Sequence, residues 1–321
     1  MPENFNKVII AGDACVDVHI ALKDLLSNDE NKVTPYNTSP GGTSAGCAVV
    51  LSCLGVDTAY LGTLGSDFGG KYLIKELKRN NIDISLTSIN DKTNTMNVFA
   101  FIDDEGERHL WGFPRNDVSY GVLNLDESII SKVASARWLH ASGMCLLADG
   151  NIKQTLPLLF KAAYEAGVDT SFDLNTRVKD ISLLDEKAVE AIREIIPYVK
   201  YLTGSALDEF VSFYPCDDYL DSLRHFANDA TVIARLGEKG VYVIDKGKEE
   251  LVSAYNVEVL DTTGAGDTFD AGFICAMLSG KDVFEAARFA NASAAYKISH
   301  SLDSKISVDK VNDIINNVST R

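Results

Sequence analysis

The chain has 321 residues, of which 46% are hydrophobic and 24% are charged. That length and composition suit one large α/β domain, or two small ones, with a fully buried core. The net charge of −16 at pH 7 opposes contact with phosphate backbones, so we expect no nucleic-acid partner and take the acidity as a source of solubility.

Short apolar runs alternate with helical patterns along the chain. The strands that we expect cover residues 7–12, 58–65, 136–141, 167–173, 198–203, 230–235 and 240–245. The helices that we expect cover residues 44–54, 68–80, 151–166, 185–196, 217–228, 265–279, 282–299 and 307–318. This alternation predicts a mostly parallel sheet with helices on both faces.

Two segments break the alternation. Residues 93–102 and 107–113 are strand-like and flank DDEG (103–106), which is a hairpin signal with Gly106 available for positive φ. Residues 14–40 also have strand character without helical periodicity. We expect these segments to form a small sheet apart from the main one, within a chain that shows no low-complexity linker and no internal repeat.

The strongest chemical signal is VLDTTGAGDTFDAGF (259–273). A strand-like run gives way to a small-residue turn and then to a helix, and free N–H groups at a helix start favour a phosphate. Asp267 would repel that phosphate unless it accepts a proton from an attacking hydroxyl. The alternative is that Asp267 is only a favourable acid in a first helical turn, but the flanking residues favour the catalytic interpretation.

Three other motifs are weaker. Gly41 and Gly42 in SPGGTSAGCAVVLSCLG (39–55) allow a close backbone approach to a ligand, although two glycines before a helix usually form a turn. ARLGEKGVYVI (234–244) is a strand, a glycine turn and a second strand, which alone indicates a plain hairpin. AGDACVD (11–17) ends the first strand, where ligands bind in open α/β sheets, so Asp17 either grips two sugar hydroxyls or merely solvates a loop.

Several function classes find no support. GSDFGGKY (65–72) resembles a phosphate-binding loop, but Tyr72 replaces the hydroxyl that would hold magnesium, so we expect Asp67 to cap a helix instead. The six cysteines form no CxxC pair and no metal-type spacing, which indicates core positions in a reducing cytoplasm. We expect no signal peptide and no membrane span, because no apolar run approaches about 20 residues. No spacing of nucleophile and histidine supports a hydrolase.

In this order, the segments resemble the ribokinase, or PfkB, carbohydrate kinases over about residues 7–300, and DTTGAGDTF is the most specific part. The resemblance implies a single kinase domain of three-layer α/β/α type. It implies a mostly parallel central sheet and a small β lid over the sugar, formed by about residues 14–40 and 93–116. It also implies phosphoryl transfer from ATP with Mg²⁺ to an alcohol group, commonly in a homodimer joined through the lids.

The resemblance assigns roles to individual positions. Asp267 matches the catalytic base, and the amides of Gly264, Ala265 and Gly266 match the anion hole. Asp17, Gly41 and Gly42 match sugar-contacting positions, Gly237 and Gly240 match the nucleotide-side turn, and Asn291 matches a position near the adenine. Asp261 and Thr263 match part of a monovalent-cation (K⁺) site found in some members.

The chain also departs from the family pattern. Gly46 stands where an asparagine usually contacts the sugar. The usual NxxE near the magnesium ion is missing, with Ser205, Asp208 and Glu209 as imperfect stand-ins, and Glu209 would organise the water molecules around Mg²⁺. Arg235 stands where threonine is common and would reach the ATP phosphates. SHSLDSKIS replaces the usual glycine-containing ending.

The substrate is less well indicated. Residues 138–150 and 168–177 look like the matching stretches of 2-keto-3-deoxygluconate kinases, so Arg115 and Arg177 would bind the carboxylate of a sugar acid. Alternatively, Arg177 serves the ATP phosphates or a loop, and Arg115 is a solvated surface residue. Phe99, Phe101 and Trp111 would line the lid or simply pack its sheet. Neutral sugars, phosphosugars, a nucleoside kinase and a non-catalytic ligand sensor remain open.

Overall fold

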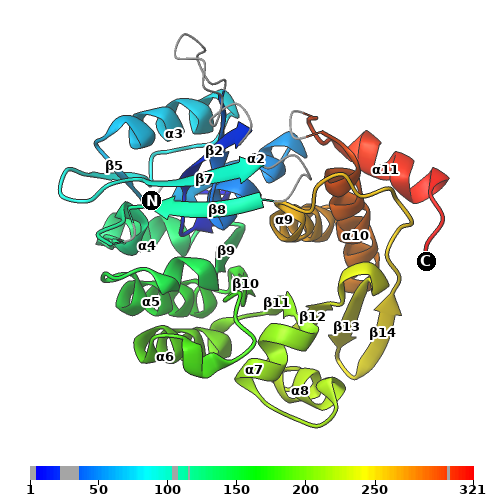
Figure 1. The fold of residues 1–321 in the computed structure, drawn as a ribbon. Helices are drawn as coiled ribbons and strands as arrows, with labels where there is room; N and C mark the ends of the chain where they lie inside the picture. Colours follow the sequence, from blue (N-terminus) through cyan, green and yellow to red (C-terminus); the bar gives the residue numbers. More distant parts are fainter. Residues whose placement is uncertain (1–4, 22–35, 103–107, 115, 302–303) are drawn as a thin grey trace.

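A computed structural model describes residues 5–21, 36–102, 108–114, 116–301 and 304–321 (Figure 1). The main sheet has eight strands in the order β14-β13-β12-β11-β10-β9-β1-β4. In chain order these are β1 (Val8–Ala11), β4 (Thr58–Leu61), β9 (Trp138–Ser142), β10 (Asp169–Asp173), β11 (Tyr201–Ser205), β12 (Thr231–Arg235), β13 (Val241–Asp245) and β14 (Lys248–Val252).

The six strands from β12 to β4 are parallel, and β13 and β14 continue the sheet antiparallel at one edge. The prediction of a mostly parallel sheet is therefore confirmed. We did not predict β14, because its sequence KEELV is charged and partly exposed. Its pairing comes from the tight turn after β13, where Lys246 and Gly247 take positive φ angles of 49° and 81°.

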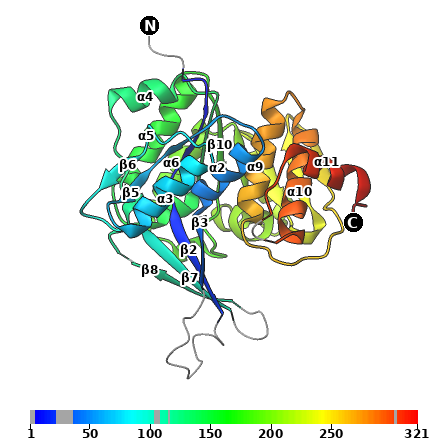
Figure 2. The ribbon, with the colours of Figure 1, turned by 90° about the horizontal axis from the view of Figure 1, so that it is seen from above.

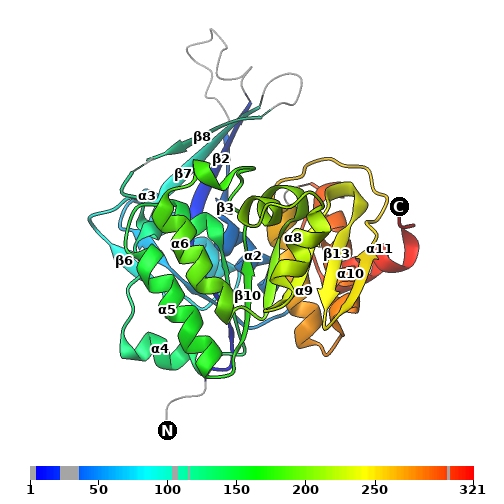
Figure 3. The ribbon, with the colours of Figure 1, turned by 90° about the horizontal axis from the view of Figure 1, so that it is seen from below.

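Helices cover both faces of this sheet (Figure 1, Figure 3). Side chains alternate along β1, so Val8 and Ile10 enter one apolar cluster while Ile9 and Ala11 enter the other. The first cluster is covered by α2 (Thr43–Cys53), α3 (Phe68–Arg79), α9 (Ala265–Leu278), α10 (Val283–Ser299) and α11 (Val308–Asn317). The second is covered by α4 (Glu127–Val133), α5 (Ile152–Glu165), α6 (Glu186–Ile195) and α8 (Tyr219–Phe226).

A second, four-stranded sheet projects from the body (Figure 2). It consists of β2 (Cys15–Ala21), β3 (Tyr36–Gly41), β7 (Met96–Ile102) and β8 (Arg108–Phe113). The expected hairpin is confirmed, since β7 and β8 pair antiparallel with Asn97 opposite Phe113.

The aromatic residues of this small sheet lie on the face opposite to Asp17. Phe99 pairs with Val18 and Trp111, whereas Asp17 pairs with Val98, and neighbouring residues of a strand face opposite sides. Phe99 packs against the apolar cluster beneath α3 rather than toward Asp17. The structure thus favours the packing interpretation for Phe99, whereas Trp111 on the same face is exposed.

One expected strand is in fact two. Residues 58–65 divide at Gly62 into β4 of the main sheet and β5 (Thr63–Gly65), which pairs with β6 (Ser88–Asn90). The division follows a close contact, because the Tyr60 hydroxyl donates a hydrogen bond of 2.7 Å to the Gly12 carbonyl and fills the space beside Gly62. Among the described helices, none is both long and apolar enough to cross a membrane.

Candidate active site

The candidate site lies where strand ends meet two helix starts. Asp173, Ser205 and Arg235 are the last residues of β10, β11 and β12. Contacts described below join these strand ends to the start of α9, and join the end of β1 to the start of α2. This is the sheet edge at which open α/β proteins bind ligands.

The start of α9 presents unpaired backbone donors. Gly264 precedes the helix with a φ of 73°, a left-handed conformation that suits glycine. The N–H of Ala265 donates to the Thr262 carbonyl at 3.2 Å, whereas those of Gly264 and Gly266 have no acceptor among the described residues. Two of the three predicted anion-hole amides are therefore available to an anion, with the helix dipole behind them.

Asp267 lies in the first turn of α9 and faces two glycines. Its Oδ2 is 3.3 Å from the position that a Cβ on Gly46 would take, and 4.0 Å from the corresponding position at Gly264. Burial raises the pKa of Asp267 to about 7, and the charges of Asp13 and Asp173 add to that effect. A carboxylate with this pKa is suited to accept a proton at neutral pH.

Asp13 connects β1 to α2. Its Oδ2 accepts a hydrogen bond from the Thr43 N–H at 2.7 Å, and its Oδ1 accepts from the Thr43 hydroxyl at 2.7 Å and the Ser44 hydroxyl at 3.0 Å. Asp13 is buried, so these donors compensate its charge. Asp13 belongs to the segment AGDACVD that we predicted to end the first strand, but its role in anchoring α2 was not predicted.

Asp17 lies on the small sheet and packs over Gly41, where any Cβ would overlap its carboxylate. Burial raises the pKa of Asp17, while the nearby charges of His19 and Arg177 act in the opposite direction. Gly42 has a φ of 91°, and a Cβ on it would lie 2.8 Å from the Cα of Ala14. The structure thus brings Asp17, Gly41 and Gly42 together, while their contact with a sugar remains a prediction.

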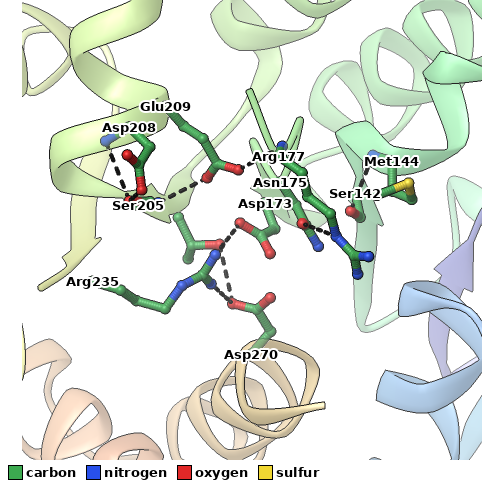
Figure 4. A network of polar contacts seen from close by, with 11 residues as sticks. Ser142, Met144, Asp173, Asn175, Arg177, Ser205, Asp208, Glu209, Arg235 and Asp270 are labelled. Atoms are coloured by element: carbon green, nitrogen blue, oxygen red, sulfur yellow. Dashed lines mark hydrogen bonds and ion pairs between the residues drawn. The ribbon is translucent and has the colours of Figure 1, made fainter. Parts of the chain in front are cut away.

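A buried ionic network joins Asp270 of α9 to the ends of β10 and β12 (Figure 4). Arg235 donates to Asp173 at 2.7 Å and to Asp270 at 3.3 Å, and the Thr203 hydroxyl donates to Asp270 at 3.0 Å. Burial and the charge of Asp173 raise the pKa of Asp270. The Arg235 Cζ lies 3.9 Å from the position of a Cβ on Gly266, so the guanidinium is next to the anion-hole turn.

Sequence reasoning missed Asp173 and Asp270. A usable signal existed for Asp270, because it follows Asp267 by three residues and therefore shares a face of α9 with it. Asp173 is 1% exposed, and its Oδ2 has no hydrogen-bond partner within the part of the chain that the structure describes.

Glu209 holds two backbone segments together (Figure 4). Its Oε2 accepts from the Ser205 N–H at 2.8 Å and its Oε1 from the Arg177 N–H at 3.3 Å. Burial raises the pKa of Glu209, and the charge of Asp173 adds to that effect. The Ser205 hydroxyl meanwhile donates to Asp208 at 3.0 Å. The predicted roles of Ser205 in nucleotide binding and Glu209 in magnesium hydration remain predictions.

The loop after β10 is conformationally strained. Asn175 and Arg177 have φ angles of 28° and 55°, which non-glycine residues rarely adopt. The Arg177 side chain is exposed, and its charge acts on both Asp17 and Asp267. Strain of this kind tends to be kept at binding sites, and here the strained loop carries the cation that acts on Asp17 and Asp267. Arg115 lies outside the described residues.

The residues that the resemblance assigns to the nucleotide come from the antiparallel edge of the sheet and from α10. Gly240 has a φ of 107°, and a Cβ on it would overlap the Val252 carbonyl, so only glycine fits. Gly237 also has a positive φ, of 59°. The Asn291 side-chain amide donates to the carbonyls of Val252 at 3.0 Å and Ser253 at 3.2 Å, which fixes the backbone after β14.

Asp261 and Thr263 remain a predicted cation site. The Asp261 Oδ1 accepts from the Thr263 N–H at 2.9 Å, and the N–H groups of Leu260 and Asp261 donate to the Ile298 carbonyl at 2.8 and 3.2 Å. Among the described residues, no group of three or more His, Cys, Asp or Glu side chains is placed to hold a metal ion.

Comparison with known proteins shows which family the chain resembles. The family model described as pfkB family carbohydrate kinase matches residues 6–310. The protein named Probable fructokinase-4 of Arabidopsis thaliana is 31% identical over 259 residues, which cover 77% of this chain and 76% of that protein. The ATP-dependent ribose-1-phosphate kinase of Halopiger xanaduensis is 27% identical over 290 residues, which cover 90% of each chain.

The fold is shared with solved structures. Fructokinase from Xylella fastidiosa, solved with bound ATP, superposes with a TM-score of 0.80 at 18% identity and covers 97% of this chain and 98% of that one. The resemblance stated from the sequence motifs and the three-layer α/β/α fold are both confirmed.

Proposed function

The chain belongs to the PfkB family of carbohydrate kinases, and we propose that it transfers the γ-phosphoryl group of ATP to a hydroxyl of a small sugar or ketosugar acid. One observation carries this proposal: the Asp267 carboxylate lies beside the unpaired Gly264 and Gly266 amides at the start of α9. This arrangement puts a proton acceptor next to an anion-binding turn.

Each group then has a chemical role. The acceptor hydroxyl gives its proton to Asp267, and its oxygen attacks the γ-phosphorus. The bond from that phosphorus to the β,γ-bridging oxygen breaks, and ADP leaves. The amides at the start of α9 stabilise charge on the transferring group, and Arg235 supports them from below. The nucleotide lies along Gly237, Gly240 and Asn291.

The metal ion fits this site only in company with ATP. The oxygens of Glu209 already accept two backbone N–H groups, so the protein offers few ligands of its own. We therefore propose that Mg²⁺ enters on the ATP phosphates, with Glu209 contacting its water shell. Bound there, the ion would neutralise charge on the β- and γ-phosphates. K⁺ would bind at Asp261 and Thr263.

The acceptor side combines Asp17, which would bind two hydroxyls, with Arg177, which would bind a carboxylate. Arg177 is the observation that favours a sugar acid, because its charge reaches both Asp17 and Asp267. A free sugar is favoured by the fructokinase among the relatives. A sensor that lost its chemistry is disfavoured because Asp267 still lies beside the unpaired amides of Gly264 and Gly266.

The experiment is an acceptor screen by ADP release. Purified protein with ATP, Mg²⁺ and K⁺ is offered fructose, ribose, ribose 1-phosphate, 2-keto-3-deoxygluconate and nucleosides, with K⁺ omitted in parallel. We expect turnover with one of the sugars or with the acid. Turnover with nucleosides alone would show that the protein is a nucleoside kinase and not a sugar kinase. No turnover with any hydroxyl compound would favour the non-catalytic sensor.

We also propose a homodimer through the small sheet acting as a lid. Trp111 and Phe113 stack with ring centroids 5.6 Å apart and are 46% and 55% exposed, on the face opposite to Asp17. Such a patch suits a self-complementary contact. Sedimentation analysis should show a dimer that Trp111→Ser with Phe113→Ser converts to a monomer, whereas a wild-type monomer would contradict the proposal.

A further inference from the structure

Lys297 reaches the anion-hole turn from a second helix. It lies in the last turn of α10, which packs beside α9 with its C-terminal end near the start of α9 (Figure 1). The Lys297 Cε is 3.5 Å from the position that a Cβ on Gly264 would take. The side of Gly264 on which a Cβ would lie therefore faces the end of the Lys297 side chain.

The close approach of the two helices is built into their sequences. A Cβ on Gly272 of α9 would lie 2.5 Å from the Ser293 hydroxyl of α10, so only glycine allows this spacing. Lys297 follows Ser293 by four residues, which puts both on the face of α10 that packs on α9. The same packing that buries Ser293 therefore directs Lys297 toward Gly264.

Lys297 and the proposed base converge on one point. The Cβ position at Gly264 that is 3.5 Å from the Lys297 Cε is also 4.0 Å from the Asp267 Oδ2. Lys297 is half-buried, and within the described residues its ammonium group forms no ion pair and no hydrogen bond. By contrast, Lys153 and Lys200 are paired with Asp185 at 2.7 Å and Asp169 at 2.6 Å.

We propose that Lys297 is a catalytic residue whose ammonium group binds an oxygen of the transferring γ-phosphoryl group. This inference rests on the proposed kinase function and adds a mobile cation to the backbone donors of Gly264 and Gly266. An ammonium has three donors and a full charge, so it can follow the phosphoryl group as negative charge shifts from ATP toward the acceptor. Arg235 cannot do the same, because Asp173 and Asp270 hold its guanidinium in place.

The simpler explanation is that Lys297 only complements the negative end of the α10 dipole. Lys78 provides a matched control for that role, because it is an exposed lysine in the last turn of α3, outside the site. The experiment compares the steady-state kinetics and melting temperatures of Lys297→Met, Lys297→Arg, Lys297→Gln and Lys78→Met with the acceptor identified by the ADP-release screen.

We expect Lys297→Met and Lys297→Gln to lower kcat by at least about tenfold, with a smaller change in the KM for the acceptor. Lys297→Arg should keep most of the activity, and added ammonium or methylammonium should restore part of it to Lys297→Met. Lys78→Met should match the wild type. If both neutral variants melt like Lys78→Met and retain wild-type kcat, the inference is wrong while the kinase function stands.

A wild-type protein without turnover would instead contradict the proposed function. In that case the inference is tested by calorimetric binding of adenylyl imidodiphosphate with Mg²⁺. Binding at least about fivefold weaker for Lys297→Met than for Lys78→Met would support a phosphate contact. Equal binding would overturn it.

Discussion

The carboxylate of Asp267 faces the bare backbone of Gly46, and the position of a Cβ on Gly46 lies 3.3 Å from Oδ2. Gly46 is in the interior of α2, where glycine weakens the helix relative to alanine. A residue that is locally unfavourable therefore keeps one oxygen of the proposed base uncovered. The resemblance implies an asparagine at this position, whereas Gly46 leaves space beside Asp267.

Gly46→Ala should separate stability from activity. The added methyl group favours the helix by about 1 kcal/mol, so the melting temperature should stay the same or rise. The same methyl group narrows the approach to Asp267, so we expect kcat/KM for the acceptor to fall about tenfold while the KM for ATP stays within about twofold. Unchanged acceptor kinetics would show that the space beside Asp267 is not used.

Asp267→Asn should abolish proton acceptance without preventing nucleotide binding. We expect kcat to fall at least about a hundredfold while ATP still binds by calorimetry. Asp309→Asn is the matched control, because Asp309 is also an acid in a first helical turn, that of α11. If the two variants were equally active, Asp267 would be only a favourable acid in the first turn of α9 and not the base.

The rate should also depend on pH in a way that reports this carboxylate. Because burial raises the pKa of Asp267 to about 7, kcat/KM in the wild type should decline about tenfold per pH unit below that value. The residual activity of Asp267→Asn should lack this decline. A wild-type rate that is flat from pH 8 to pH 5 would contradict the assignment.

Asp267 should also affect the free energy of unfolding. Its pKa rises from an ordinary value of 3.8 to about 7 on folding, so the folded state binds this proton more tightly and the ionised carboxylate destabilises the fold. The free energy of unfolding of the wild type should therefore fall as pH rises from about 4 to about 7. Asp267→Asn should be more stable than wild type by about 4 kcal/mol at pH 8, because the shift of about three pKa units is worth about 1.4 kcal/mol per unit, and by less than about 1 kcal/mol at pH 4. Urea denaturation at both values measures this, and an equal difference at both would contradict it.

The ionic network around Arg235 predicts that substitutions at Arg235 and Asp270 have strongly coupled effects on the free energy of unfolding. Arg235→Met leaves Asp173 and Asp270 buried without their cation, so we expect a loss of about 3–5 kcal/mol in the free energy of unfolding. Asp270→Asn in that background should recover part of the loss, because one buried charge is removed. A double-mutant cycle by urea denaturation measures the coupling, and an interaction below about 0.5 kcal/mol would contradict the network.

Arg177→Ala should discriminate between acceptor classes. If the substrate is a ketosugar acid, kcat/KM should fall at least about tenfold because a charge-assisted contact is lost. With a neutral sugar as the true substrate, the change should be small. Arg177→Lys keeps the charge without the forked geometry of the guanidinium. A kcat/KM for the ketosugar acid between those of wild type and Arg177→Ala would therefore further support a bidentate contact.

The parts of the site that the sequence predicted are those in which neighbouring residues act together. Gly264, Ala265, Gly266 and Asp267 span one turn, so a single motif specifies both the donors and the base. The Gly41–Gly42 pair and the turn at Gly237 and Gly240 are equally local. In each case the backbone conformation of a few consecutive residues decides the chemistry.

The parts that escaped prediction depend on tertiary contacts. Arg235 meets residues that are 35 and 62 positions away in the chain, and no local pattern indicates which strand ends lie side by side. Lys297 was missed because its position is set by how closely α10 packs on α9. In the fold, β14 was missed because its sequence is charged, and the break between β4 and β5 depends on the contact between Tyr60 and Gly12.

Asp13 links the anchoring of α2 to the pKa of Asp267, the proposed base. The same negative charge that accepts hydrogen bonds from Thr43 and Ser44 also raises the pKa of Asp267. Neutralising Asp13 would thus loosen a helix and acidify the base at once. For anyone who engineers this enzyme toward a lower working pH, proton affinity and scaffold rigidity cannot be adjusted independently through this residue.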